Sequence, residues 1–309
     1  MADEKGMADE KKMTGETEDK LARSLTAETT ELLPFLPYLL QDLWELGSNP
    51  RDIVKLIEKH MPVSKDTKML DLACGKGAVS IRVAEEFDVR VDGFDLMPEF
   101  IAYAERKANE HNVSALCRFA AGDANDITNT ARDYDCVIFG AAGNILGGPR
   151  ETILKLLKTV KRGGYIIIVE AYLRSGSGID AVKFKYDDYL TRDRWACLFE
   201  DIGLRLVDEM PANDDTNDNA DGDAGGNADG DAGGNAGGNA DGNADGNADG
   251  KYDFDAENKA IALRAGELIA LYPEKRLLFE SYVQSQLNEC EDLENSVVGV
   301  TWMLRKEEF

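Results

Sequence analysis

Residues 71–77 read Asp-Leu-Ala-Cys-Gly-Lys-Gly and lie between a short predicted strand, 68–70, and a predicted helix, 78–87. An acidic residue at a strand end, followed by two glycines one residue apart, is typical of a turn that binds a nucleotide cofactor. Glycine lets the backbone approach a ligand where a Cβ would collide. The helix start adds unpaired N–H groups and the positive end of a dipole. The stretch therefore predicts a strand–turn–helix unit with a ligand at its turn.

Two more acidic residues follow predicted strands. The second strand, 89–94, ends at Asp95, and the third strand, 115–121, ends at Gly122-Asp123-Ala124. An acid after the second strand of a βαβ unit can accept hydrogen bonds from ribose hydroxyls. Asp123 can accept from an exocyclic amine, and the N–H of Ala124 can donate to an adenine ring nitrogen. Each Asp could instead be a helix cap or turn residue, but three acids at three successive strand ends favour a ligand site.

These segments resemble the class I S-adenosylmethionine-dependent methyltransferases. The resemblance rests on 71–77, Asp95 and Gly122-Asp123-Ala124. It extends to Tyr134-Asp135-Cys136-Val137-Ile138-Phe139-Gly140 and to Val160-Lys161-Arg162-Gly163-Gly164-Tyr165, and covers roughly residues 68 to 210. It implies an α/β fold: a Rossmann-like, seven-stranded, mostly parallel sheet with helices on both faces. The family places the last strand antiparallel between the fifth and the sixth.

The resemblance also implies S-adenosylmethionine as cofactor and a set of residues that bind it. In the family pattern Asp71 lies near the amino end of the cofactor, the turn lies under its methionine part, Asp95 takes the ribose and Asp123 the adenine. Gly140 starts the loop beside the sulfonium. Ala73 stands where many members carry Gly. The implied cofactor-binding residues are Asp71, Ala73, Gly75, Gly77, Asp95, Leu96, Asp123, Ala124 and Gly140.

NAD is the competing cofactor, because Gly75-x-Gly77-x-x-Ser80 nearly fits the dinucleotide fingerprint. That fingerprint needs its first glycine directly after the strand and room for a pyrophosphate. Asp71 would repel a pyrophosphate, and Asp123 has no standard role in NAD binding. We therefore rank NAD below S-adenosylmethionine.

The acceptor is expected outside the carboxyl ends of the fourth and fifth strands. Asn144, Glu170 and Tyr172 are the catalytic candidates there. Glu170 could orient the acceptor or act as a base, or make only a structural hydrogen bond. Tyr172 could line the pocket or shield the sulfonium by a cation–π contact, or simply pack. His60 and His111 are better explained as cations at helix C-termini.

Composition and net charge indicate which class of methyl acceptor to expect. The chain has 309 residues, 43% hydrophobic, and a formal net charge of −24. Residues 211–250 hold ten Asp and no Lys or Arg, which leaves −14 on the rest. Such a charge repels phosphate backbones and argues against a nucleic acid partner. We expect a small-molecule methyl acceptor; the alternatives are an RNA or protein methyltransferase, or a non-catalytic protein that binds the cofactor.

Cysteine usage and hydropathy bear on the compartment. The five cysteines include no CxxC pair, and no apolar run reaches membrane-spanning length. We expect free thiols in a reducing cytoplasm, no membrane partner and no metal site. Cys117, Cys136 and Cys197 are interpreted as small core residues, although a thiol relay remains an alternative.

The chain divides into five predicted segments. Residues 1–20 are expected to be a disordered tail, 21–66 a helical cap and 67–210 the cofactor-binding core. Residues 211–252 repeat Asn-Ala-Asp-Gly and are interpreted as a disordered linker. Residues 253–309 are expected to hold two helices separated by Pro273, then the last strand. The cap includes a predicted helix over 36–43, from the apolar spacing, and a second helix after Asn49. The two late helices either cap the acceptor pocket or mediate a homodimer.

Overall fold

The computed structural model describes residues 14–183, 189–212 and 254–307. Its centre is a seven-stranded sheet of order β3-β2-β1-β4-β5-β7-β6, in which only β7 runs antiparallel to its neighbours β5 and β6. The strands are β1 (Lys68–Leu72), β2 (Arg90–Asp95), β3 (Cys117–Ala121), β4 (Tyr134–Gly140), β5 (Val160–Leu173), β6 (Leu204–Pro211) and β7 (Val297–Lys306). The predicted fold and the antiparallel last strand are confirmed.

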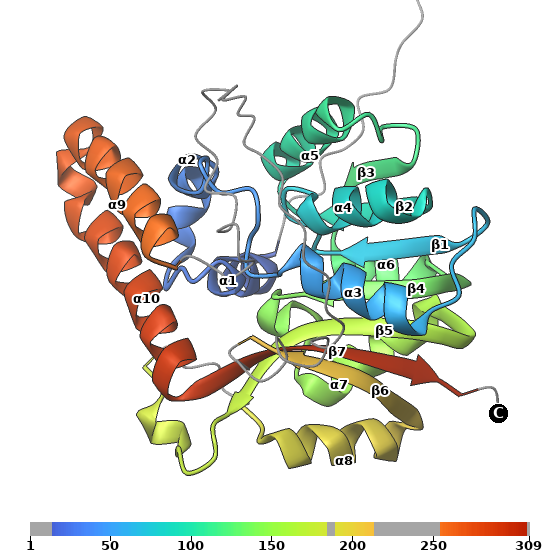
Figure 1. Ribbon diagram of the computed structural model, residues 1–309. Coiled ribbons are helices and arrows are strands. Elements are labelled where there is room, and N and C mark those ends of the chain that lie inside the picture. The colour runs from blue at the N-terminus through green and yellow to red at the C-terminus, as the bar shows by residue number, and fades with distance from the viewer. Residues whose placement is uncertain (1–13, 184–188, 213–253, 308–309) are drawn as a thin grey trace, which may run out of the picture.

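Helices cover both faces of the sheet (Figure 1). One face packs on α3 (Pro50–His60), α4 (Ala78–Phe87) and α5 (Pro98–Glu110), and the other on α6 (Ala124–Thr130), α7 (Pro149–Thr159) and α8 (Arg192–Ile202). The central strands read as continuous apolar runs, as in Ile166-Ile167-Ile168, because both of their faces are buried. The helix ends follow local chemistry, since Thr191 caps α8 and Gly203 ends it in a left-handed conformation.

A third apolar cluster joins the two ends of the chain beside the sheet (Figure 1). It unites the N-terminal elements with the late helical pair, across the carboxyl ends of the parallel strands. Its elements are α1 (Gly15–Ser24), the 3-10 helix η1 (Thr30–Phe35), α2 (Leu36–Leu39), α9 (Phe254–Leu271) and α10 (Arg276–Asn295). The 3-10 turn η5 (Pro273–Lys275) separates the two late helices, as Pro273 predicted. We call these elements the cap. Helix α3, which we assigned to the cap, packs on the sheet instead.

Two expectations for the N-terminal region are wrong. Residues 15–20, placed in a disordered tail, begin α1. The Thr14 side chain accepts a hydrogen bond from the N–H of Thr17, and Leu21 and Ala22 are buried in the cap, so burial offsets the entropy of ordering the helix. The predicted helix over 36–43 ends at Leu39. The carbonyls of Leu40 and Leu43 accept hydrogen bonds from the ammonium of Lys76.

Other expectations fall outside the described residues or need correction. Residues 1–13 of the expected tail and residues 213–253, which hold the Asn-Ala-Asp-Gly repeat, lie outside them. Cys117 and Cys136 are buried as predicted, but Cys197 is exposed, because the buried face of α8 is made by Trp195 and Phe199. Within the described part of the chain, no helix has the length and apolarity to span a membrane.

Candidate functional site

A cavity of about 1070 Å³ lies at the carboxyl ends of the parallel strands, and residues of the cap form part of its wall. It brings together most of the residues that the sequence singled out, although they come from five different strand ends. The predicted residues that line it are Asp71, Ala73, Gly75, Asp95, Leu96, Asp123, Ala124, Gly140, Asn144 and Glu170. The order β3-β2-β1-β4-β5 reverses at β1, and parallel sheets bind ligands at such a switch point.

The turn after β1 is held against β2 by hydrogen bonds. The N–H of Gly75 donates to Oδ2 of Asp95 over 2.9 Å, and the N–H of Met97 donates to Oδ1 over 2.9 Å. Both Ala73 and Gly75 adopt left-handed conformations, with φ of 57° and 52°. The glycine common at position 73 of this turn would adopt that conformation more readily than alanine does. The two bonds fix the rotamer of Asp95 at the edge of the cavity.

Two of the three acids are deeply buried. Asp71 is 3% exposed and accepts a hydrogen bond of 2.6 Å from the Ser80 hydroxyl. Burial raises the pKa of Asp71 to about 7, more than this hydrogen bond lowers it. Burial also raises the pKa of Asp95 to about 6, against the lowering effect of its backbone donors. Because an isolated buried carboxylate is costly, both side chains would gain from a ligand that brings a positive charge or hydrogen-bond donors.

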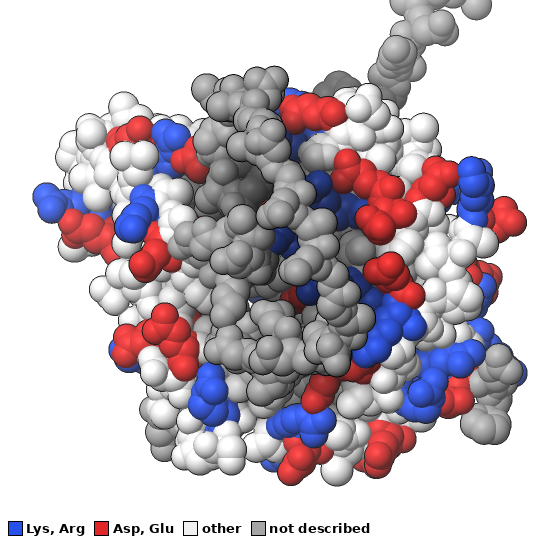
Figure 2. All heavy atoms as spheres, viewed as in Figure 1, with Lys and Arg blue, Asp and Glu red and all other residues white. Residues whose placement is uncertain are grey.

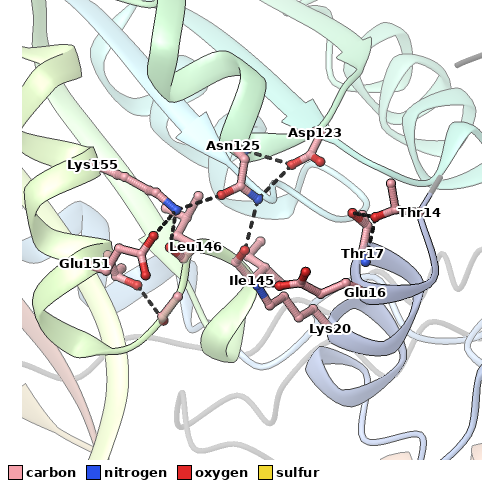
Figure 3. A network of polar contacts seen from close by, with 12 residues as sticks. Thr14, Glu16, Thr17, Lys20, Asp123, Asn125, Ile145, Leu146, Glu151 and Lys155 are labelled. Carbon is pink, nitrogen blue, oxygen red and sulfur yellow. Dashed lines mark hydrogen bonds and ion pairs between the residues drawn. The ribbon is translucent and has the colours of Figure 1, made fainter.

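One carboxylate oxygen of Asp123 accepts structural hydrogen bonds, and the other is available to a ligand (Figure 3). Its Oδ1 caps α6 by accepting from the N–H of Asn125 at 2.8 Å and from the Asn125 side chain at 3.0 Å. Among the described contacts, Oδ2 has no donor. Asn125 in turn donates to the carbonyl of Ile145 and accepts from Lys155, both at 3.0 Å. Since Lys155 is also paired with Glu151, this network fixes Asp123 and the 3-10 turn η2 (Gly143–Leu146) relative to each other.

Lys76, inside the turn, fastens it to the cap. The side chain is 3% exposed and its ammonium donates to the carbonyls of Leu40 and Leu43, each at 2.5 Å. The ammonium also lies 4.7 Å from the centre of the Tyr103 ring. The carbonyl of Lys76 accepts a hydrogen bond of 3.1 Å from the indole of Trp44. Sequence analysis missed this role, because nothing local to Lys76 indicates which carbonyls it meets.

Gly77 and Tyr172 do not line the cavity. A Cβ on Gly77 would lie 2.8 Å from Cβ of Ala104 and 2.9 Å from the Phe119 ring, so this glycine serves packing of the turn. Tyr172 packs with its ring centre 6.1 Å from that of Trp302. Strand β5 continues to Leu173 rather than ending near Val169, so Tyr172 lies in the sheet instead of a loop. Gly77 therefore shapes the turn without lining the cavity, and Tyr172 packs within the sheet.

Further residues reach the cavity without any local signal in the sequence. Tyr189 precedes α8, and Glu289 and Asp292 come from α10. The two histidines stay away from it, since His60 pairs with Asp208 and His111 with Glu85. Among the described residues, no group of three or more His, Cys, Asp or Glu is placed to hold a metal ion.

Comparison with known proteins agrees with this geometry. A family model described as a methyltransferase domain matches residues 63–196. Residues 63–196 belong to the class I S-adenosylmethionine-dependent methyltransferase family. The resemblance noted from the sequence is therefore confirmed for this methyltransferase domain, which contains β1 to β5 and the beginning of α8.

Individual relatives are distant from this methyltransferase domain. Ajmaline N-methyltransferase of Rauvolfia serpentina is 25% identical over 132 residues, which are 40% of this chain and 45% of that protein. The chain spans about half the length of the curated relatives it matches.

Solved structures share the fold. A methyltransferase of Thiobacillus denitrificans, in complex with S-adenosylhomocysteine, is 16% identical with a TM-score of 0.62, over 87% of this chain and 97% of that one. The [4+2]-cyclase SpnF is 14% identical with a TM-score of 0.59, over 94% of this chain and 96% of that one.

Proposed function

We propose that this protein transfers the methyl group of S-adenosylmethionine to a small-molecule acceptor. The observation that carries the proposal is the convergence of Asp71, Asp95 and Asp123, from three successive strand ends, on one cavity beside a glycine turn. These groups match the chemistry of the cofactor, which presents an ammonium, a ribose diol and an exocyclic amine along one molecule.

Each group of the cofactor has a suitable partner. Asp71 would face the ammonium, and Asp95 would accept from the ribose hydroxyls with lone pairs left over from its two backbone bonds. The unused Oδ2 of Asp123 would accept from the adenine amine, beside the N–H of Ala124. A volume of about 1070 Å³ is at the upper end of small-molecule sites, so it leaves room for an acceptor beyond Gly140.

The protein's contribution to the reaction is position and exclusion of water. When bound, the cofactor supplies a methyl group already activated by its sulfonium. The cap closes over the strand ends, and the fixed carboxylates and turn hold the reacting groups in line. Orientation of this kind can contribute about 7–11 kcal/mol to lowering a barrier. Burial raises the pKa of Glu170 to about 7, so its carboxylate could accept a proton from an acceptor near neutral pH.

The cavity favours a small acceptor. The cap contributes lining residues from α1, α9 and α10, so it partly covers the strand ends and gives the cavity walls from both ends of the chain. Of the residues that the structure describes, twelve acidic side chains and four lysines line it, a balance that repels a phosphate backbone. Acidic and basic side chains are interspersed over the described surface in Figure 2, rather than gathered into a basic track.

Calorimetric titration of S-adenosylhomocysteine tests the proposal. We expect micromolar affinity, about −8 kcal/mol, for the unmodified protein. Asp95→Asn should weaken it at least tenfold, because the amide NH2 cannot accept and would face the N–H of either Gly75 or Met97, which disturbs the turn and removes an acceptor for the ribose. Asp92→Asn is the matched control, since Asp92 lies on the same strand but pairs with Arg118 outside the cavity. Absence of binding to the folded protein, or equal binding by both variants, would contradict the proposed site.

A further inference from the structure

The acceptor half of the cavity is lined by carboxylates from outside the cofactor-binding strands. Glu170 comes from β5, and Glu289 and Asp292 come from α10. We call these three residues the acidic wall. Strand β5, which carries Glu170, lies beyond β4 in the sheet order, away from β2 and β3, and α10 leads into β7, which pairs with β5. In the proposed function Asp71 would face the ammonium of the cofactor, which would leave the acidic wall for a second molecule.

The three carboxylates converge on one region. Tyr189 also lines the cavity, and the negative charges of Glu289, Glu170 and Asp292 add to its burial in raising the pKa of its hydroxyl. Asp292 likewise adds to the effect of burial on the pKa of Glu289. Carboxylates this close to one another cannot all ionise without a compensating positive charge or strong donors.

The donors available within the described protein are unequal. Asp292 accepts from the N–H of Lys183 at 2.9 Å on both oxygens, and Glu289 accepts from the Thr26 hydroxyl at 2.5 Å. Glu170 accepts only a long bond of 3.4 Å, from the N–H of the adjacent Ala171. It is therefore the carboxylate of the acidic wall with the most unused capacity to accept hydrogen bonds.

The lysines of the cavity do not neutralise the wall. Lys20 pairs with Glu16, Lys155 with Glu151, and Lys76 with two carbonyls of the cap. Lys55 is the fourth; it is exposed on α3, and no ion pair joins it to Glu170 among the described contacts. Lys183 is held in an ion pair with Glu291. Among the residues described as lining the cavity there is no arginine or histidine.

We propose that the methyl acceptor is a small molecule with a protonated amine, bound by the acidic wall, and that Glu170 removes its proton. The inference rests on the proposed methyltransferase function. The ammonium proton passes to the Glu170 carboxylate, which frees the nitrogen lone pair. The nitrogen then forms its bond to the methyl carbon as the carbon–sulfur bond breaks, and sulfur keeps that electron pair. A neutral or anionic acceptor would bring no positive charge to Glu170 and Glu289, so the burial of these two carboxylates would stay unfavourable.

Paired acceptors test this inference. The probes are primary and secondary amines from ethanolamine to tryptamine in size, each with the isostere in which hydroxyl replaces the amine. Formation of S-adenosylhomocysteine is measured by mass spectrometry, and acceptor binding by calorimetry with S-adenosylhomocysteine present. We expect amines to be at least tenfold better than their isosteres in kcat/KM. Equal use of both sets, or no preference for amines in binding and turnover, would overturn the inference.

Variants locate the effect in the wall. Glu170→Gln should lower kcat with the best amine at least tenfold, and Glu289→Gln should mainly raise its KM. Glu274→Gln, on the connection between α9 and α10 outside the cavity, removes the same charge and should change neither. Unchanged affinity for S-adenosylhomocysteine verifies that each variant is folded. If the unmodified protein does not bind S-adenosylhomocysteine, the proposed function itself is contradicted. If it binds S-adenosylhomocysteine but does not prefer amines, only this inference is contradicted.

Discussion

Single atoms decide which residues fit at the end of β4, where the segment before α3 meets the sheet. A Cβ on Gly140 would lie 2.3 Å from the Ser48 hydroxyl oxygen and 3.3 Å from Cβ of Ser48. Glycine at the end of β4 therefore serves two purposes, since it lets Ser48 approach and leaves space at the cavity. The family pattern indicated only the second purpose, because the approach of Ser48 is a contact between segments about 90 residues apart.

A substitution at Gly140 can be rescued by its neighbour. Gly140→Ala should lower the free energy of unfolding by about 1–3 kcal/mol, because the added methyl overpacks a filled site. Adding Ser48→Ala removes the closest atom, so the double variant should be more stable than Gly140→Ala alone. Urea denaturation of the four proteins measures this coupling. Strictly additive effects would show that Ser48 does not set the requirement for glycine.

At the scale of elements, the buried ammonium of Lys76 joins the turn after β1 to the cap. Lys76 belongs to that turn by sequence and to the cap by its hydrogen bonds to Leu40 and Leu43. Burial lowers the pKa of Lys76 to about 8. The accepting carbonyls follow the end of α2 at Leu39, where the chain leaves the helix that the apolar spacing over 36–43 predicted. These hydrogen bonds therefore couple the position of the turn to that of the cap.

Removal of that charge should loosen both elements. Lys76→Met keeps the length of the side chain but leaves the Leu43 carbonyl without its Lys76 donor, while the Leu40 carbonyl keeps the N–H of Leu43. The loss of the Leu43 bond should cost about 1–3 kcal/mol in unfolding free energy. Affinity for S-adenosylhomocysteine should fall with it, because the turn and Leu46 above it lose their support.

Lys55→Met is the matched control, since Lys55 also lines the cavity but is exposed on α3. Urea denaturation and calorimetry measure the two effects. A Lys76→Met protein as stable and as tightly binding as the control would show that the cap is held by its apolar contacts alone.

At the scale of the whole molecule, ionisation of the buried carboxyl groups of the site opposes folding. Burial raises the pKa of Asp71 and Glu170 to about 7 and that of Asp95 to about 6. Unfolded carboxyl groups titrate near pH 4. Between about pH 4 and pH 7 the folded protein without ligand therefore binds more protons than the unfolded chain. The stability from these groups is fully present below pH 4 and is lost as the pH rises through 7.

Asp71→Asn isolates one of these groups, since the amide resembles the protonated carboxyl and can still accept from Ser80. From pH 5 to pH 8 the unmodified protein should lose about 2–3 kcal/mol more unfolding free energy than the variant, at about 1.4 kcal/mol per unit. Urea denaturation of both proteins at the two pH values provides the comparison. Parallel pH dependence would mean that Asp71 is already ionised in the folded protein.

The sequence by itself determined the strand–turn–helix unit, the acids Asp71, Asp95 and Asp123, and the antiparallel place of the last strand implied by the family. The first two follow from residues that are neighbours in the chain, where periodicity, glycine and strand-end acids act locally. The place of the last strand came only from the family resemblance. Only the tertiary structure decided that residues 15–20 fold into α1 and that α2 is short. It also decided that Tyr172 lies in the sheet, and that Glu170 lines the same cavity as Glu289 and Asp292. Those features depend on contacts between distant segments, and such contacts leave no pattern in either segment alone.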